Sequence, residues 1–425
     1  MCHRISIAIL ITLFAATVCV AADEDPYLWM EEVENEKALA WAKERSETDT
    51  AAIEAAPEFA EIYASLIEIY NSRDRIPFPG FRGAWIYNFW QDAEHVRGIW
   101  RRTFLSEYVK DSPSWEIVLD LDALAEAEGE NWVWSEVTCL EPDYRRCMIG
   151  LSRGGADATV VREFDTFSKE FVADGFVLPE AKHQIDWMDN DTLWVATDFG
   201  EGSLTNSGYA RFAKKWRRGT PLEEATTVFE ASVDDVFTFA YSSHTPEGRF
   251  DLVNLTPEFF RGTNYLMLGE RLVKIDIPED AQLQAFFKGH LLVSLRTDWT
   301  IGGTTYPQDA LLAIDVDDFL KGRRDFDVLF NPQERVALDQ VGSTRRYLVY
   351  TTLDNVHSRL YRLAPEENGW TKEEVELPGI GTVSLSQPGS TGSYFSDSTD
   401  DFFFTYTDFV TPTSLFAVDL SLIHI

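Results

Sequence analysis

The segment Arg346-Tyr-Leu-Val-Tyr-Thr-Thr352, followed by Ser358-Arg-Leu-Tyr-Arg-Leu363, carries the pattern that decides the fold. Each run is short and rich in apolar, aromatic or β-branched residues, and a polar turn separates the two. Runs of this kind are typical of paired β-strands. The same strand, turn and strand pattern starts again at several other places: Ala84, Arg146, Asp191, Val236, His290 and Phe402.

Seven such hairpins therefore occur, at intervals of about 45 to 60 residues. That spacing is typical of four-stranded blades, so the sequence predicts an all-β fold, a seven-bladed β-propeller over residues 77–419. An array of β-sandwiches is the main alternative. Even spacing and the lack of Pro/Ser-rich linkers between the hairpins favour one closed ring.

The chain begins with a stretch that has the features of a signal peptide, residues 1–22. His3 and Arg4 precede an apolar run from Ile5 to Val20, and small residues follow at the expected cleavage point. The alternative is a membrane anchor, but the run is about 16 residues long, whereas a spanning helix needs about 20. We therefore expect a cleaved signal and a secreted or periplasmic protein.

Residues 23–76 form the predicted N-terminal helical segment. Apolar residues recur there at helical spacing between about Asn35 and Asn71, and Pro57 is placed to open a second helix. Both helices are amphipathic, so each needs a partner surface.

Acidic residues outnumber basic ones, 71 to 37, which gives a formal net charge of −34. Such a surface repels phosphate backbones and anionic lipids, so we expect neither nucleic acid nor a membrane as partner. No His or Cys residues lie at ligand spacing, and we expect no metal and no cofactor. The acidic run around Asp317 lacks the glycine and distal Glu of a calcium-binding loop.

Two cysteines remain after the signal, Cys139 and Cys147, on either side of a turn-like segment. In an oxidising compartment, cysteines this close across a bend favour a local disulfide. A pair of buried free thiols is the alternative.

Several stretches resemble the prolyl oligopeptidase family of serine peptidases, in the family's order. The stretch Asp25-Pro-Tyr-Leu-Trp-Met-Glu-Glu32 is similar to the N-terminal entry motif of the family. The opening of the family's first blade resembles two stretches here, Tyr87-Asn-Phe-Trp-Gln-Asp92 and Arg97-Gly-Ile-Trp-Arg-Arg-Thr103. Later motifs are Gly154-Gly-Ala-Asp157, Arg162-Glu-Phe-Asp165, Asp174-Gly-Phe176, Pro179-Glu-Ala-Lys182, Asp198-Phe-Gly-Glu-Gly-Ser203 and Thr405-Tyr-Thr-Asp-Phe-Val-Thr-Pro-Thr413.

The resemblance implies that the propeller gates access to an α/β-hydrolase domain, which cleaves short peptides after proline with a Ser-Asp-His triad. It also implies that the helical segment packs on that domain. The family's hydrolase domain would follow the propeller, and we expect it to be missing from this chain. The last residues, 420–425, do not resemble the family's continuation and look non-native.

We assign no catalytic residue. Gly150-Leu-Ser152-Arg-Gly154 fits the G-x-S-x-G pattern of a nucleophile elbow, but that site needs a strand followed by a helix. Here a turn leads into a β-branched run, so Ser152 is interpreted as part of a blade hairpin. Five arginines are interpreted as ion-pair partners between blades or across the domain interface: Arg97, Arg101, Arg102, Arg153 and Arg162.

Two functions remain open. The first is the substrate-gating propeller of a prolyl oligopeptidase-like endopeptidase, with proline-containing oligopeptides and the missing hydrolase domain as partners. The second is a stand-alone, non-catalytic propeller that binds or scaffolds. Apolar residues on the helices, Trp41, Phe59, Tyr63 and Ile67, favour the first, because without a hydrolase domain they would form an exposed patch.

Overall fold

The computed structural model describes residues 25–32, 35–367, 369–386 and 392–419. It divides into two compact units, Met1–Ser72 and Arg73–Ile425, which are described separately below. The expected signal peptide and the residues 420–425 lie outside the described residues. The division falls close to the expected start of the propeller at residue 77.

The first unit is helical. A 3-10 turn, η1 (Leu28–Met30), precedes helices α1 (Glu36–Glu54) and α2 (Phe59–Tyr70). Helix α1 begins where the Asn35 side chain accepts hydrogen bonds from the backbone N–H groups of Lys37 and Ala38. Large apolar side chains of both helices are exposed: Leu39, Trp41, Ile53, Ile62, Tyr63, Leu66, Ile67, Ile69 and Tyr70.

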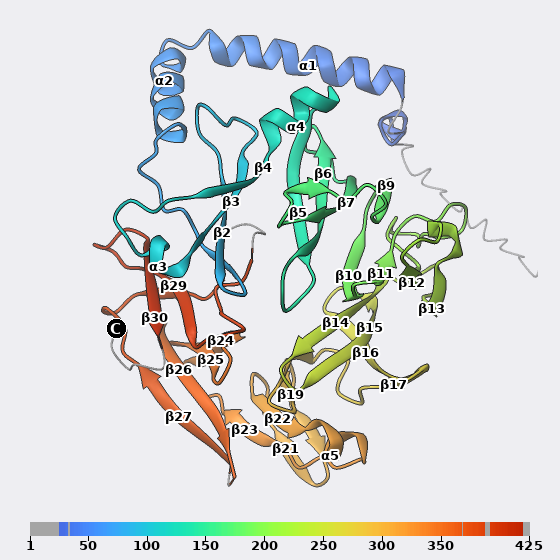
Figure 1. The fold of residues 1–425 in the computed structure, drawn as a ribbon, viewed down its shortest axis with the longest axis vertical. Coiled ribbons are helices and arrows are strands. Elements are labelled where there is room, and N and C mark those ends of the chain that lie inside the picture. The colour runs from blue at the N-terminus through green and yellow to red at the C-terminus, as the bar shows by residue number, and fades with distance from the viewer. Residues whose placement is uncertain (1–24, 33–34, 368, 387–391, 420–425) are drawn as a thin grey trace, which may run out of the picture. The chain divides into compact units, whose positions relative to one another are not determined.

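The second unit is the predicted seven-bladed ring, and Figure 1 shows its sheets arranged around a common centre. Blade 1 contains β1 (Gly80–Arg82), β2 (Trp85–Trp90), β3 (Ile99–Phe104) and β4 (Glu116–Asp120). Blade 2 contains β5 (Trp132–Cys139), β6 (Arg146–Arg153), β7 (Thr159–Asp165) and β8 (Glu170–Phe171), with β9 (Val177–Ala181) also paired to β7. Blade 3 contains β10 (Gln184–Asp189), β11 (Thr192–Ala196), β12 (Phe212–Arg217) and β13 (Thr226–Glu230).

The remaining blades repeat the same antiparallel meander. Blade 4 contains β14 (Phe237–Thr245), β15 (Gly248–Glu258), β16 (Arg261–Leu268) and β17 (Arg271–Lys274). Blade 5 contains β18 (Gln282–Phe287), β19 (His290–Ser294), β22 (Leu311–Asp315) and β23 (Asp327–Phe330), with an inserted hairpin of β20 (Trp299–Ile301) and β21 (Thr304–Tyr306). Blade 6 contains β24 (Val336–Ser343), β25 (Leu348–Asp354), β26 (His357–Glu366) and β27 (Gly369–Val375), and blade 7 contains β28 (Thr382–Ser384), β29 (Asp401–Thr407) and β30 (Ser414–Asp419).

In the described part of the ring, four short helical pieces lie in the connections. They are α3 (Leu105–Tyr108), α4 (Leu121–Glu128), η2 (Leu222–Glu224) and α5 (Val316–Leu320). The acidic run that lacked a calcium-loop pattern belongs to α5, where the Asp315 side chain caps the helix by accepting from the backbone N–H of Asp318.

The core consists of seven apolar clusters, one between each pair of neighbouring blades. Strand β19 shows how they form: Leu291 and Val293 pack toward blade 4, whereas Leu292 packs toward blade 6. Successive side chains of a strand point to opposite faces, and here both faces are buried. This is why the strands read as continuous apolar runs instead of alternating ones.

The structure corrects the position that the sequence assigned to one of the seven hairpins. In six blades the recognised hairpin is formed by the second and third strands, as in β25 and β26. In blade 4 the run that starts at Val236 becomes the first, inner strand β14 instead. Inner strands are short or mixed in polarity, so the pattern of apolar runs did not reveal most of them.

Alternate turns of a meander lie at opposite ends of the ring. We call "the entry end" the one where the chain enters each blade and where second strands turn into third strands. We call "the inner-turn end" the one where first strands turn into second strands.

Candidate functional site

The turns at the inner-turn end converge on a cavity of about 240 Å³. Six of the seven blades contribute to its lining. One lining residue from each of these blades is Phe81, Tyr144, Thr245, Lys288, Arg345 and Asp397. A small hollow lined by several blades of a ring is a natural place for a ligand or for a barrier to one.

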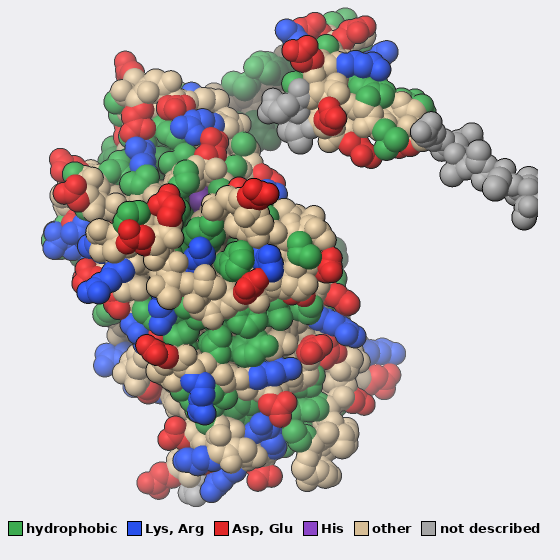
Figure 2. Space-filling model, turned by 90° about the vertical axis from the view of Figure 1, so that its right-hand side faces the viewer, with side chains coloured by type: hydrophobic (Ala, Val, Ile, Leu, Met, Phe, Trp, Pro, Cys, Tyr) green, Lys and Arg blue, Asp and Glu red, His purple; other side chains and the backbone are tan. Residues whose placement is uncertain are grey.

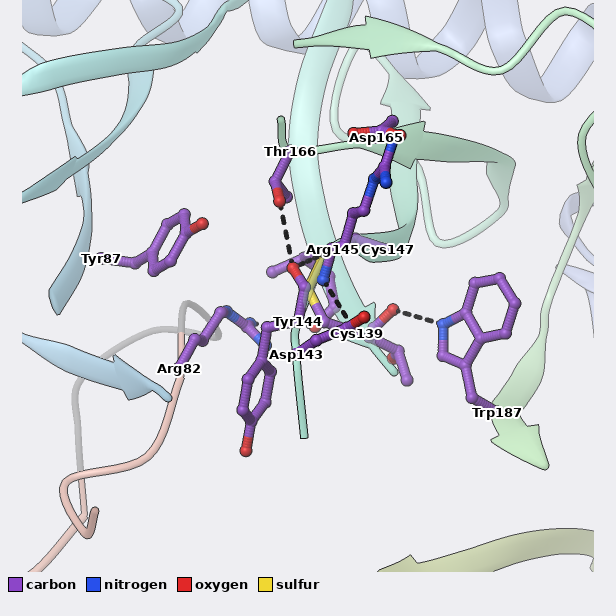
Figure 3. The surroundings of a disulfide bond; sticks show 12 residues. Arg82, Tyr87, Cys139, Asp143, Tyr144, Arg145, Cys147, Asp165, Thr166 and Trp187 are labelled. Atoms are coloured by element: carbon purple, nitrogen blue, oxygen red, sulfur yellow. Dashed lines mark hydrogen bonds and ion pairs between the residues drawn. A yellow bond between two sulfur atoms is a disulfide. The ribbon is translucent and has the colours of Figure 1, made fainter. Parts of the chain in front are cut away.

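A disulfide fixes the turn that blade 2 contributes to this cavity (Figure 3). Cys139, at the end of β5, lies opposite Cys147 on β6, and a disulfide joins them across a sequence separation of 8. Inside the turn, the backbone N–H of Tyr144 donates to the carbonyl of Leu140 at 2.9 Å. The Thr166 hydroxyl donates to the Tyr144 carbonyl at 3.1 Å. The turn is therefore held by covalent and hydrogen bonds together, and it includes a cis Glu141–Pro142 peptide.

The Tyr144 side chain forms a clasp between blades 2 and 7. Its hydroxyl donates to Asp397 Oδ2 at 2.6 Å, between residues 253 positions apart. Between these two blades, the phenol ring of Tyr144 lies against the turn of blade 1, since a Cβ atom added to Gly83 would lie 3.5 Å from Tyr144 Cδ2. The clasp thus spans blade 1 and joins two blades that are not neighbours.

Burial shapes the charges around the clasp. It raises the pKa of the Tyr144 phenol, with nearby carboxylates adding to the effect, so the hydroxyl stays a donor. Burial also raises the pKa of Glu141, which the negative charge of Asp397 raises further. The fully buried guanidinium of Arg82 has its pKa lowered to about 10 by desolvation, against the favourable field of Tyr87. These groups lie in a poorly hydrated environment, where charge pairs are stronger than in water.

Polar contacts also link neighbouring blades at the inner-turn end. His244 Nε2 lies 3.1 Å from the Trp187 carbonyl, between blades 4 and 3. Lys288 pairs with Glu247 at 3.4 Å, between blades 5 and 4. The backbone N–H of Phe81 donates to the Ser393 carbonyl at 2.7 Å, between blades 1 and 7. The turns around the cavity are therefore fixed to one another.

No nucleophile arrangement is present in the part of the chain that the structure describes. Ser152 lies within β6 and is 3% exposed, and the following turn leads into β7, as expected from the sequence. None of the hydrogen bonds among the described residues joins a histidine to a serine: His95 contacts Asp92, and His183 contacts Thr197 and Thr159.

Among the described residues, Arg102, Arg153 and Arg162 form the expected ion pairs, whereas the contacts of Arg97 and Arg101 are of other kinds. Arg97 donates to Asn131 at 2.7 Å, and Arg162 pairs with Glu128 at 2.8 Å. The other three contacts are Arg102 with Glu116, Arg153 with Glu130 and Glu180, and Arg101 between the rings of Trp90 and Trp115. Among the described residues no group of three His, Cys, Asp or Glu side chains is placed to hold a metal ion.

The entry end differs from the inner-turn end in its exposed apolar side chains. Turns at the entry end expose Val96, Tyr209, Val233, Phe259, Phe260, Val356, Ile380, Phe409 and Val410. Turns at the opposite end expose Val109 and Phe167. On the face drawn in Figure 2, acidic, basic and apolar side chains are interspersed. Exposed apolar side chains are therefore more numerous in the turns of the entry end than in the turns of the opposite end. No helix in the described residues is both long and apolar enough to cross a membrane.

Comparisons with known proteins agree with this geometry. Residues 17–422 match the family described as "Prolyl oligopeptidase, N-terminal beta-propeller domain". The chain is 33% identical over 409 residues to an uncharacterized peptidase, y4nA, of Sinorhizobium fredii, and the match covers 93% of this chain and 55% of that protein. An uncharacterized peptidase of Rickettsia prowazekii, RP174, is 30% identical over 373 residues, with 82% and 51% covered.

Among solved structures, a post-proline cleaving enzyme from Rickettsia typhi is similar with a TM-score of 0.83 at 26% identity. The match covers 91% of this chain and 57% of that enzyme. Oligopeptidase B from Leishmania major, at 17% identity and a TM-score of 0.69, shares the fold, and that match covers 93% of this chain and 54% of that protein. This chain therefore spans about half the length of the relatives that it matches.

Proposed function

This chain belongs to the prolyl oligopeptidase family, as its N-terminal β-propeller domain, and we propose that it is the substrate-gating part of a serine endopeptidase that cleaves short peptides after proline. The observation that carries the proposal is the similarity to a post-proline cleaving enzyme over 91% of this chain. In this proposal the catalytic triad belongs to an α/β-hydrolase domain that is not part of the 425 residues.

The entry end supports docking of that domain. Phe259, Phe260, Phe409 and Val410 project from turns of blades 4 and 7 and are exposed. Burying them against a partner would remove a large apolar area from water, at about 25 cal/mol per Å². The exposed apolar face of α2, with Ile62, Tyr63 and Leu66, supports a second contact of the same kind.

The inner-turn end supports the gating role. Its cavity is small, and the clasp from Tyr144 to Asp397 reduces the freedom of the turns around it. A ring closed at one end by fixed turns restricts a covered active site to peptides that are thin and flexible. Folded proteins would be excluded by size alone.

The disulfide supports the expected export. Disulfides persist in secreted and periplasmic proteins and are rare where thiols are kept reduced. We therefore propose that the protein acts in an oxidising compartment after cleavage of residues 1–22. The measurement is the intact mass of the exported protein, with and without alkylation after reduction.

The activity is tested on the complete product of the reading frame that contains this sequence. We expect it to release a fluorophore from a blocked Gly-Pro reporter much faster than from matched Gly-Arg or Gly-Ala reporters, and to react with a fluorophosphonate probe. The 425-residue chain alone is the control and should do neither. Faster cleavage after arginine would refute proline specificity, and strong labelling of the 425-residue chain would refute the placement of the triad.

A further inference from the structure

A second cavity lies between blades 4 and 5, away from the clasp, and has a volume of about 490 Å³. Its two walls come from inner strands, β14 of blade 4 and β18 of blade 5. The turn around Phe260 and the connection that includes Glu279 also line it, which places it toward the entry end. We call it the blade 4/5 cleft.

Aromatic rings form the blade 4 wall. Phe239 and Tyr241 are two residues apart on β14, so they share one face, and their ring centroids lie 5.7 Å apart at 28°. Both are half-buried. Phe260 adds a third ring and is 77% exposed. Aromatic surfaces of this kind pack well against proline rings and aliphatic side chains.

Side-chain amides form the floor, and one of them has an unused donor. Asn254 Nδ2 donates to Asn264 Oδ1 at 3.0 Å across β15 and β16, and Thr256 donates to Asn254 Oδ1 at 2.8 Å. Asn264 is 9% exposed, and its Nδ2 donates to no group among the described residues. This donor is not among the fully buried polar atoms, so it is open to a ligand oxygen from the cleft as it is to water.

The opposite wall repeats the amide chemistry. Gln284 Nε2 donates to Ser294 Oγ at 2.8 Å and to Gln282 Oε1 at 3.3 Å. Both glutamines line the cleft. Side-chain amides offer a donor and an acceptor in the same arrangement as a peptide group, so they suit a peptide backbone.

The charges around the cleft balance. Arg261 and Arg296 line it together with Glu279 and Asp280. Asp280 accepts from Thr297 at 2.8 Å, and Glu279 lies 3.9 Å from Lys274. A cleft with two cations and two anions does not select a charged group such as a phosphate or a chain terminus. It suits the uncharged interior of a peptide.

We propose that the blade 4/5 cleft binds an extended, proline-containing segment of the peptide substrate, with prolyl rings on Phe239 and Tyr241 and a peptide carbonyl accepting from Asn264 Nδ2. The assignment of the ligand as substrate rests on the proposed function. The two inner strands that wall the cleft run in the same direction, from the entry end to the inner-turn end.

The test is a titration of the 425-residue chain with an acetylated and amidated fluorescent octapeptide of alternating Ala and Pro, followed by anisotropy. The main variant is Asn264→Asp, which removes both amide donors and keeps the oxygen that Asn254 needs. A second variant, Gln282→Leu, changes an exposed side chain of β18 and is safe for folding. Asn190→Asp adds the same charge in an exposed turn of blade 3 and is the matched control.

We expect saturable binding to the unaltered chain, at least tenfold weaker binding to Asn264→Asp, weaker binding to Gln282→Leu, and no change for Asn190→Asp. Melting curves measure whether each variant is folded. If Asn264→Asp does not fold, the binding of Gln282→Leu decides the outcome. Absence of saturation, or equal binding by both cleft variants, overturns the proposal. Displacement of the peptide by a neutral oligosaccharide whose binding needs Asn264 overturns the ligand class.

The proposed function and the peptide site in the blade 4/5 cleft can be refuted independently of each other. A complete enzyme that does not cleave after proline, beside peptide binding that depends on Asn264, refutes proline-specific cleavage and leaves the cleft as a peptide site. A complete enzyme that cleaves after proline, with a KM unchanged by Asn264→Asp, refutes the cleft alone.

Discussion

Removing the disulfide between Cys139 and Cys147 tests how the turn of blade 2 is stabilised. The bond closes a loop with a sequence separation of 8. In the chain-entropy treatment, a loop of about nine residues restricts the unfolded chain by about 2.6 kcal/mol at 25 °C. The double variant Cys139→Ala/Cys147→Ala should lose about that much free energy of unfolding.

The expected change in melting temperature follows from the size of the ring. Unfolding entropy is about 2.1 cal/mol/K per residue, so roughly 350 residues give about 0.7 kcal/mol/K, and a loss of about 2.6 kcal/mol lowers Tm by about 4 °C. Both cysteines are buried, so the small cavity left by two sulfur atoms adds to the loss.

Differential scanning calorimetry of the 425-residue chain is the assay, with and without a phosphine reductant. Reduction should lower the Tm of the unaltered chain and leave the double variant unchanged, which separates the bond from general effects of the reductant. A Tm within about 1 °C of the unaltered, oxidised chain would refute the entropy argument. A single cooperative transition must be shown first, because the calculation assumes one.

Two further predictions concern polar groups near the centre of the ring. Tyr144→Phe removes the phenol donor of the exposed Asp397 carboxylate and should lower the free energy of unfolding by about 0.5–1.5 kcal/mol; urea unfolding measures this, and an unchanged midpoint would show that the clasp adds no stability. Burial raises the pKa of Asp186 to about 6. Its folded pKa lies above the unfolded value of about 3.9, so the contribution of this one group to stability is greatest below about pH 4 and falls by about 3 kcal/mol as pH rises through about 6. Asp186→Asn should remove that part of the pH dependence and raise stability at about pH 7.5; equal slopes between about pH 4.5 and 7.5 for both proteins would contradict it.

The strands that were predictable from sequence are those with both faces buried. Leu291, Leu292 and Val293 must all be apolar because the chain has blades on each side, and this makes a signal that is visible without a structure. The inner strands also contact both neighbouring blades, as Phe286 and Phe287 of β18 do, but their apolar runs are shorter or are interrupted by polar residues. β1 and β28 have three residues each, and β14 mixes aromatic with polar side chains.

The disulfide was accessible to sequence reasoning because its two cysteines are close along the chain. The clasp was not, because Tyr144 and Asp397 are 253 residues apart and each looks like an ordinary turn residue. The unused donor of Asn264 could not be predicted either, because the hydrogen bonds of a side-chain amide in a strand depend on which residues lie next to it in space. Ser152 shows the reverse case, in which a local motif matched a reactive site and the surrounding strands exclude it.

The contact between blades 7 and 1 joins parts of the chain that are synthesised far apart in time. Six interfaces of the ring join sheets that are consecutive along the chain, but the cluster of Phe81, Ile86, Tyr394 and Phe403 joins its two ends. At about 5–20 residues per second, roughly 300 residues of synthesis separate these partners by about 15–60 s. During that time the face of blade 1 that packs on blade 7 is uncovered, and its apolar residues are available for non-native contacts. The ring therefore closes only when its last sheet is available to cover the first.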